Sequence, residues 1–258
     1  MSQMKSSAAK IMVVLLLAAL SGCHSSGKAV TEDETDALRR QGYARAPQIT
    51  EVTQEGVSFV VSGIATPDGR VQFIYAGSNV GLNADSKGRF RVALPSGPAG
   101  GLYDLMVEDR GRYMHAEGRL FVPAGSPDKA VVLRPGGASQ PLSATKNVLA
   151  VVDYDSAGGV AVAGRVEAGQ TVNFVADGVT IGRTQSDDTG RYHLTAQIAA
   201  PTAVPVQIDA AVEAGSDQQK RPIMVSLPAG NDQITKLTDG WRIDWVLPGG
   251  GVQTTLVF

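Results

Sequence analysis

The stretch Val71-Gln72-Phe73-Ile74-Tyr75 gives the clearest sign of the fold. Its first, third and fifth residues are apolar and point to one side of an extended chain, while the second and fourth point to the other. Such alternation is typical of a half-buried β-strand. The same pattern recurs upstream over residues 57–62 and downstream in Phe90-Arg91-Val92-Ala93-Leu94. Turn residues separate the three segments, at Pro67-Asp68-Gly69 and again over residues 85–88. The sequence therefore predicts consecutive β-strands joined by tight turns.

Further strands follow towards the middle of the chain. We predict them at Tyr103–Val107, Gly118–Val122 and Ala130–Leu133, with no helical pattern between them. Gly and Pro are frequent, with 30 and 13 residues, which suits many short strands joined by turns. Strands spaced about 8–12 residues apart indicate a β-sandwich or a barrel.

The same plan returns about 100 residues further along the chain, which indicates a repeated domain. Gly63 with Val71-Gln72-Phe73 recurs as Gly164 with Val172-Asn173-Phe174. Three more pairs recur in order: residues 85–90 as 187–192, residues 123–125 as 228–230, and residues 135–137 as 248–250. We therefore expect a first domain over residues 47–135, a linker over 136–147 and a second domain over 148–258.

Three runs of the first copy carry a resemblance to a known family. They are Ser62–Val71, Asn83–Phe90 and Gly101–Leu105, and together they resemble the Ig-like domains of bacterial envelope and adhesin proteins. The second copy resembles the family more loosely. The resemblance implies an all-β chain with two tandem Ig-like β-sandwich domains. Its motifs are turn residues, so they specify a fold and leave the function open.

The N-terminal residues predict export and a lipid anchor. An apolar run over residues 11–20 follows Lys5 and Lys10, as in a signal peptide, and is shorter than the roughly 20 residues that span a bilayer. Leu20-Ser21-Gly22-Cys23 resembles the lipobox of bacterial lipoproteins, which implies removal of residues 1–22 and acylation of Cys23, the only cysteine. The alternative is an ordinary secreted protein with a free thiol.

Residues 23–46 predict a spacer between the anchor and the first domain. A capping-box pattern at residues 31–34 predicts a short helix from about Glu32 to Gln41. His24, and not an aspartate, follows Cys23. By the resemblance to lipoproteins of two-membrane bacteria, this implies an outer-membrane location, facing either the periplasm or the cell surface.

No motif in the sequence predicts catalysis, a cofactor or a metal. The three histidines are scattered, and neither a zinc spacing, a phosphate-binding loop nor a Gly-x-Ser-x-Gly elbow is present. The net charge of −2 argues against a nucleic-acid partner. Residues 153–158 begin like a calcium loop, with Asp153 and Asp155, but lack its later acids. The alternative is a turn in which an aspartate caps its own backbone.

The end of the sequence predicts a β-hairpin, with a Gly-rich loop between Trp241–Leu247 and Val252–Phe258. Trp241 and Trp245 share one strand face. They either fill the core of the second domain or form an exposed aromatic binding surface.

We therefore expect an outer-membrane-anchored lipoprotein that acts as a noncatalytic binding or assembly module of the cell envelope. Its partners would be the membrane, through the lipid, and an envelope protein complex. The alternative is a lipid-anchored protein that binds a surface or cell-wall polysaccharide through Trp241 and Trp245.

Overall fold

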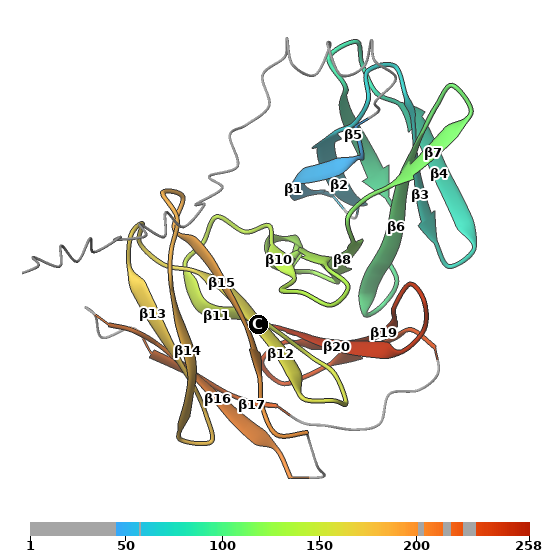
Figure 1. Ribbon diagram of the computed structural model, residues 1–258. Helices are drawn as coiled ribbons and strands as arrows, with labels where there is room; N and C mark the ends of the chain where they lie inside the picture. Colours follow the sequence, from blue (N-terminus) through green and yellow to red (C-terminus); the bar gives the residue numbers. More distant parts are fainter. Residues whose placement is uncertain (1–44, 57, 201–203, 214–217, 224–230) are drawn as a thin grey trace, which may run out of the picture. The chain divides into compact units, whose positions relative to one another are not determined.

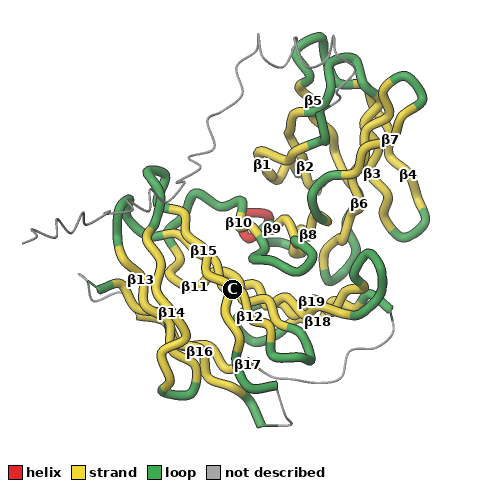
Figure 2. The backbone as a smooth tube through the Cα atoms, in the orientation of Figure 1, coloured by secondary structure: helices red, strands yellow, loops and turns green. Residues whose placement is uncertain are grey.

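The computed structural model describes residues 45–56, 58–200, 204–213, 218–223 and 231–258. The signal peptide, Cys23 and the short predicted helix lie outside these residues. The described chain is built of β-strands, as Figure 1 shows. The exception among the described residues is the three-residue 3-10 helix η1 (Pro127–Lys129), red in Figure 2. None of the helices in the described chain is long and apolar enough to cross a membrane. The predicted all-β sandwich class is therefore confirmed.

The first sandwich packs a three-stranded sheet, in the order β1-β2-β5, against a second sheet in which β4, β3, β6 and β7 lie side by side. Its apolar core lies between the sheets and includes Phe59, Val61, Phe73 and Phe90, the alternating residues of the predicted strands. The strands are β1 (Gln48–Glu55), β2 (Ser58–Ile64), β3 (Arg70–Tyr75), β4 (Ser78–Asn83), β5 (Arg89–Leu94), β6 (Gly100–Asp109) and β7 (Arg112–His115).

The second sandwich repeats this arrangement. Strands β11, β12 and β15 form one sheet and β14-β13-β16-β17 the other, around a core that includes Val162, Phe174 and Tyr192. The strands are β11 (Asn147–Tyr154), β12 (Gly159–Arg165), β13 (Thr171–Ala176), β14 (Val179–Gln185), β15 (Arg191–Gln197), β16 (Val206–Val212) and β17 (Gln218–Ile223).

The repeat extends to single contacts. Gly63 pairs with Phe90 between β2 and β5, and Gly164 pairs with Tyr192 between β12 and β15. The ring of Phe90 lies 5.9 Å from that of Phe73, and the ring of Tyr192 lies 5.7 Å from that of Phe174. A glycine is needed at both positions, because a Cβ would approach a backbone carbonyl oxygen to 2.3 Å at Gly63 and 2.5 Å at Gly164.

Three aspartates close turns of the same form. The Asp155 turn joins the paired strands β11 and β12, whereas the Asp85 and Asp187 turns each join strands of different sheets. In each turn one carboxylate oxygen, from Asp85, Asp155 or Asp187, accepts the backbone N–H groups two and four residues further on. The donor pairs are Lys87 and Arg89, Ala157 and Gly159, and Thr189 and Arg191. The third residue after each aspartate is a glycine with φ of +77°, +91° or +81°. This left-handed conformation explains the glycine, because other residues adopt it at a cost.

Each sandwich also carries three added strands, at different places. In the first, β8 (Arg119–Pro123), β9 (Val131–Leu133) and β10 (Gln140–Pro141) extend one sheet from the first half of β6. In the second, β18 (Gln233–Lys236), β19 (Trp241–Val246) and β20 (Val252–Val257) extend the other sheet from β11. Figure 2 draws both sets of added strands in yellow. Residues 136–147, expected as a linker, contain β10 and the buried Ala138 and Ser139.

The two additions meet in one apolar cluster, which we call the joint core. The first sandwich contributes Leu102, Phe121, Val131 and Leu133, and the second contributes Ala150, Val151, Trp241, Ile243, Trp245 and Val257. The six-stranded sheet β15-β12-β11-β20-β19-β18 is thus covered on both faces over β11 and β20, by the core of its own sandwich and by the joint core. Residues Gly42–Phe258 accordingly form one compact unit.

Candidate functional site

Both tryptophans lie in the joint core. Trp241 is 2% exposed and Trp245 is 1% exposed. The structure thus corrects the prediction of an exposed aromatic surface at these residues. They are buried, as the alternative held, but between the two sandwiches and not within the second alone. The reason is that β8 and β9 cover this face of β19, a pairing between distant segments that strand periodicity does not reveal.

Two lysines lie beside the Trp241 ring. The Lys236 ammonium nitrogen lies 3.6 Å from the ring centroid, and that of Lys129, from the first sandwich, lies 5.5 Å from it. A cation over an indole face is attracted by the negative π cloud of the ring. Trp241 is therefore occupied on its faces by the protein's own side chains, which leaves it no face for a sugar ring.

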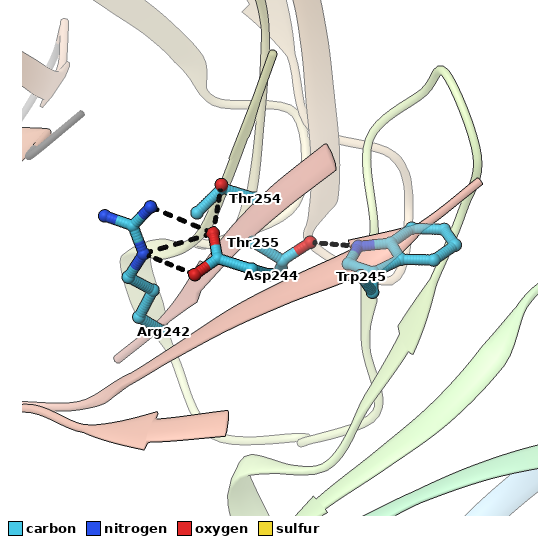
Figure 3. Close-up of polar contacts among 5 residues, drawn as sticks. All are labelled: Arg242, Asp244, Trp245, Thr254 and Thr255. Atoms are coloured by element: carbon cyan, nitrogen blue, oxygen red, sulfur yellow. Dashed lines mark hydrogen bonds and ion pairs between the residues drawn. The ribbon is translucent and has the colours of Figure 1, made fainter. Parts of the chain in front are cut away.

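The β19–β20 strand pair carries polar groups on both faces (Figure 3). On one face the Arg242 guanidinium donates to both carboxylate oxygens of Asp244, at 2.9 Å to each, and the Thr254 hydroxyl donates to the same carboxylate at 2.5 Å. On the other face the Trp245 indole N–H donates to the Thr255 hydroxyl at 3.1 Å. These bonds fix the side chains of β19, so this wall of the joint is rigid.

The Thr255 hydroxyl in turn donates to Asp153, a fully buried carboxylate at the centre of a hydrogen-bond network. Asp153 also accepts bonds from the backbone N–H and hydroxyl of Ser139, both at 2.7 Å, and from the Gln253 amide at 3.1 Å. Burial raises the pKa of Asp153 from 3.8 to about 6, against these hydrogen bonds, which lower it. The network attaches residues 134–139 to β11 and β20, because Gln253 also bonds Arg134 and Gly136 through their backbone groups.

The calcium hypothesis for Asp153 and Asp155 gains no support from this geometry. The Asp153 carboxylate is surrounded by N–H and O–H donors, and one oxygen of Asp155 caps its own turn. The part of the chain that the structure describes contains no group of three His, Cys, Asp or Glu side chains that could hold a metal. His115 and His193 lie in β7 and β15, in different sandwiches, so the structure does not bring them together.

A groove of about 830 Å³ opens beside the joint core, between the two sandwiches. Its apolar lining includes Leu105 from β6 and Leu247 from the β19–β20 loop. Its charged lining is mainly acidic, with Asp104, Glu117 and Asp232 against Arg119. Ligand pockets in proteins typically measure about 300–1,000 Å³, so the groove has room for a ligand or a short peptide segment.

Arg119 connects the two walls of this groove. Its guanidinium lies 2.8 Å from the Asp104 carboxylate in the first sandwich and 2.6 Å from that of Asp232 in the second. Asp232 also accepts the backbone N–H of Val246 at 3.1 Å. The three charged groups are partly exposed, so solvent screens them and they contribute little to stability. They connect the two groove walls through the single guanidinium group of Arg119.

The sequence did not predict this groove. Arg119 and Asp232 are 113 residues apart, and neither lies in a motif. The sequence shows that both residues are charged, but no pattern in it predicts that they form an ion pair between the two sandwiches.

Comparison with known proteins found no matching family model and no matching curated protein. Among solved structures, the chain is similar to the BSP domain of a biofilm-associated protein, with 15% identity and a TM-score of 0.26 over 76% of this chain and 32% of that one. It is also similar to the central fibronectin-III array of RIM-binding protein, with 9% identity and a TM-score of 0.26 over 78% and 79% of the two chains.

A third similar structure is a Ca²⁺-stabilized adhesin that helps an Antarctic bacterium bind ice, with 17% identity and a TM-score of 0.25 over 81% of this chain and 58% of that one. This chain thus spans about a third of the length of the first of these structures. Likeness at these TM-scores carries no argument about function. The β-sandwich assignment rests on the strand order of this chain itself.

Proposed function

We propose that this chain is a noncatalytic binding and assembly module of the bacterial cell envelope, held at the outer membrane through an acylated Cys23. One observation carries the proposal: the joint core makes the two sandwiches one unit and leaves at their junction a groove with an apolar lining and mainly acidic charged residues. A pre-formed groove loses little conformational freedom when it binds a partner, and so binds at a smaller entropic cost.

The tether adds to this effect. A lipid-anchored protein is confined to a surface, which raises its effective concentration for a partner on the same surface. Stable anchoring takes at least two acyl chains, and an acylated N-terminal cysteine of the lipobox type would carry three. Tethering and a rigid groove together suit a module that docks one component of an envelope complex.

The charge of the groove favours a particular kind of partner. Three carboxylates and one guanidinium leave it acidic, so a protein segment with lysine or arginine side chains complements it. The second candidate, a polysaccharide, is favoured by the same carboxylates as acceptors for sugar hydroxyls. Against it stands the burial of Trp241 and Trp245, since stacking on an aromatic face is missing.

The test is affinity capture of the full-length protein from mild-detergent extracts of envelopes, with intact mass measured on the same sample. We expect a chain that begins at triacylated Cys23, together with a stoichiometric protein partner. Glu117→Gln, in the groove lining, should reduce partner recovery. Glu213→Gln, an exposed glutamate in the second sandwich, is the matched control and should leave it unchanged.

Two outcomes would contradict the proposal. An unmodified mass would remove the anchor and with it the tethering argument. A lipidated protein captured alone would remove the protein partner, and binding to cell-wall or surface glycans would then be the function to test.

A further inference from the structure

A second, smaller pocket lies away from the groove, where residues 134–143 cross the outer face of β12 and β15. Its volume is about 220 Å³. Arginines approach it from three directions: Arg134 from the crossing segment, Arg165 from the end of β12 and Arg191 from the start of β15. His193 also lines it, and the one acid in the lining is Asp187.

Two of the arginines are cross-strand neighbours. Arg165 lies directly opposite Arg191 in the β12–β15 register. Like charges in this position repel each other and destabilise the strand pair. The first sandwich has Ile64 opposite Arg89 at the corresponding place between β2 and β5, so the fold itself does not require two arginines.

The protein holds Arg165 in place without neutralising it. Its guanidinium donates to the carbonyl oxygen of Thr189, at 2.7 and 3.0 Å, and to that of Ser143 at 3.1 Å. Carbonyl oxygens are neutral acceptors, so the positive charge stays. One carboxylate oxygen of Asp187 accepts three bonds from its own turn, and the charge of Asp187 offsets part of the charge of Arg191 but not that of Arg165.

The other two arginines leave buried donors without an acceptor. The Nε–H groups of Arg134 and Arg191 are both buried and have no hydrogen-bond partner among the described residues. Arg134 uses a terminal nitrogen to bond Gln140 at 2.8 Å and Glu117 at 3.1 Å. A buried donor without a partner is costly and is uncommon in native proteins. Both Nε atoms are closed to a water-sized group, so the parts of these side chains that a pocket ligand can meet are the terminal nitrogens of the guanidinium groups.

We propose that this pocket binds an oxyanion, the phosphate or carboxylate group of a small polar ligand. The arginine fork matches the planar or tetrahedral oxygens of such groups, and three guanidinium groups line the pocket against a single carboxylate. The volume admits a single charged group or one acidic sugar residue and excludes a long chain. The site does not depend on the lipid anchor, and its one link to the acidic groove is the bond between Arg134 and Glu117.

The test is a titration of the purified full-length protein in detergent with inorganic phosphate, galacturonate and neutral galactose, at constant ionic strength. We expect saturable binding of phosphate or galacturonate, a rise of melting temperature with the same anion, and no binding of galactose. Whichever anion binds more tightly identifies whether the natural ligand carries a phosphate or a carboxylate.

Arg191→Gln should weaken anion binding at least tenfold, while the protein alone melts no lower, because the repulsion with Arg165 is relieved. The matched control is Arg183→Gln, an exposed arginine of β14, which should change binding less than twofold. Arg191→Lys keeps the charge without the fork, and so should bind with intermediate affinity even if the glutamine variant folds poorly. Equal weakening in the Arg183 and Arg191 variants, or no saturation by either anion, would overturn the proposal.

Discussion

Each sandwich has a body, β1–β7 in the first and β11–β17 in the second, and three added strands, β8–β10 and β18–β20. The two bodies are alike, whereas the additions differ. The bodies share strand order, the paired glycine and aromatic residue, and the aspartate-capped turn between strands of different sheets. The additions join different sheets, β8–β10 beside β6 and β18–β20 beside β11, and yet they meet in one joint core. The repeat therefore explains each body alone, whereas the unrepeated strands make the two bodies a single unit.

The largest effect is expected where the additions meet. Phe121→Ala removes a fully buried ring from the joint core and should lower the free energy of unfolding by about 4 kcal/mol. It should also separate unfolding into two transitions, because the bodies lose their shared contacts. Urea denaturation followed by tryptophan fluorescence and by circular dichroism would detect this, since both tryptophans lie in the joint core.

Phe73→Ala is the matched control. It removes an equally buried ring, but from the core of the first sandwich. If the Phe121 variant unfolds in a single transition with coincident probes, the joint core does not couple the bodies and the comparison fails.

The next effect tests whether the two bodies depend equally on their paired glycines. Gly63→Ala and Gly164→Ala should each destabilise the protein by about 3 kcal/mol, because each added Cβ meets a backbone carbonyl oxygen. Thermal and chemical unfolding of both variants measures the difference. Gly81→Ala, where the nearest atoms would lie 3.8 Å from the Cβ, should change stability by less than about 1 kcal/mol. Strongly unequal losses at Gly63 and Gly164 would mean that the two bodies are not energetically equivalent.

The smallest effect is a pH dependence of the unfolding free energy, which comes from the buried carboxyl of Asp153. Burial raises the pKa of Asp153 from 3.8 to about 6, so the folded carboxyl keeps its proton at a pH where the unfolded one has lost it. This contribution to stability is complete below pH 3.8 and is lost as the pH rises through 6. Between pH 4.5 and 7 the loss should be about 2 kcal/mol.

Comparison with Asp153→Asn isolates this contribution, because the variant keeps every other titrating group. The difference in unfolding free energy between the two proteins should fall by that amount across the pH range. A difference that stays constant with pH would show that Asp153 titrates alike in the folded and unfolded chains.

The sequence predicted the bodies well, because their signals are local. Alternation over residues 71–75 and 90–94 placed β3 and β5, and the recurrence of Gly63 as Gly164 indicated the repeat. Strands with weaker alternation were not predicted, among them β4 with its sequence Ser-Asn-Val-Gly-Leu-Asn. The predictions about Cys23 and the spacer remain predictions, since residues 1–44 lie outside the described chain.

The candidate sites could not be predicted in the same way. Trp241 and Trp245 were correctly placed on one strand face, but what covers that face comes from β8 and β9, more than 100 residues earlier. Ser139 was predicted to lie in a linker, although it bonds a buried carboxylate. Both cases depend on tertiary contacts between distant segments, which local patterns do not encode.

The position of β20 between β11 and β19 also affects how the chain can fold. Val151 pairs with Val257, so this central ladder closes only after the whole intervening sandwich has been brought back on itself. Contacts of such long sequence separation slow folding, because the entropy of loop closure is lost before the contacts form. The joint is therefore expected to form late, after the first sandwich, and to be the rate-limiting step in reaching the native state.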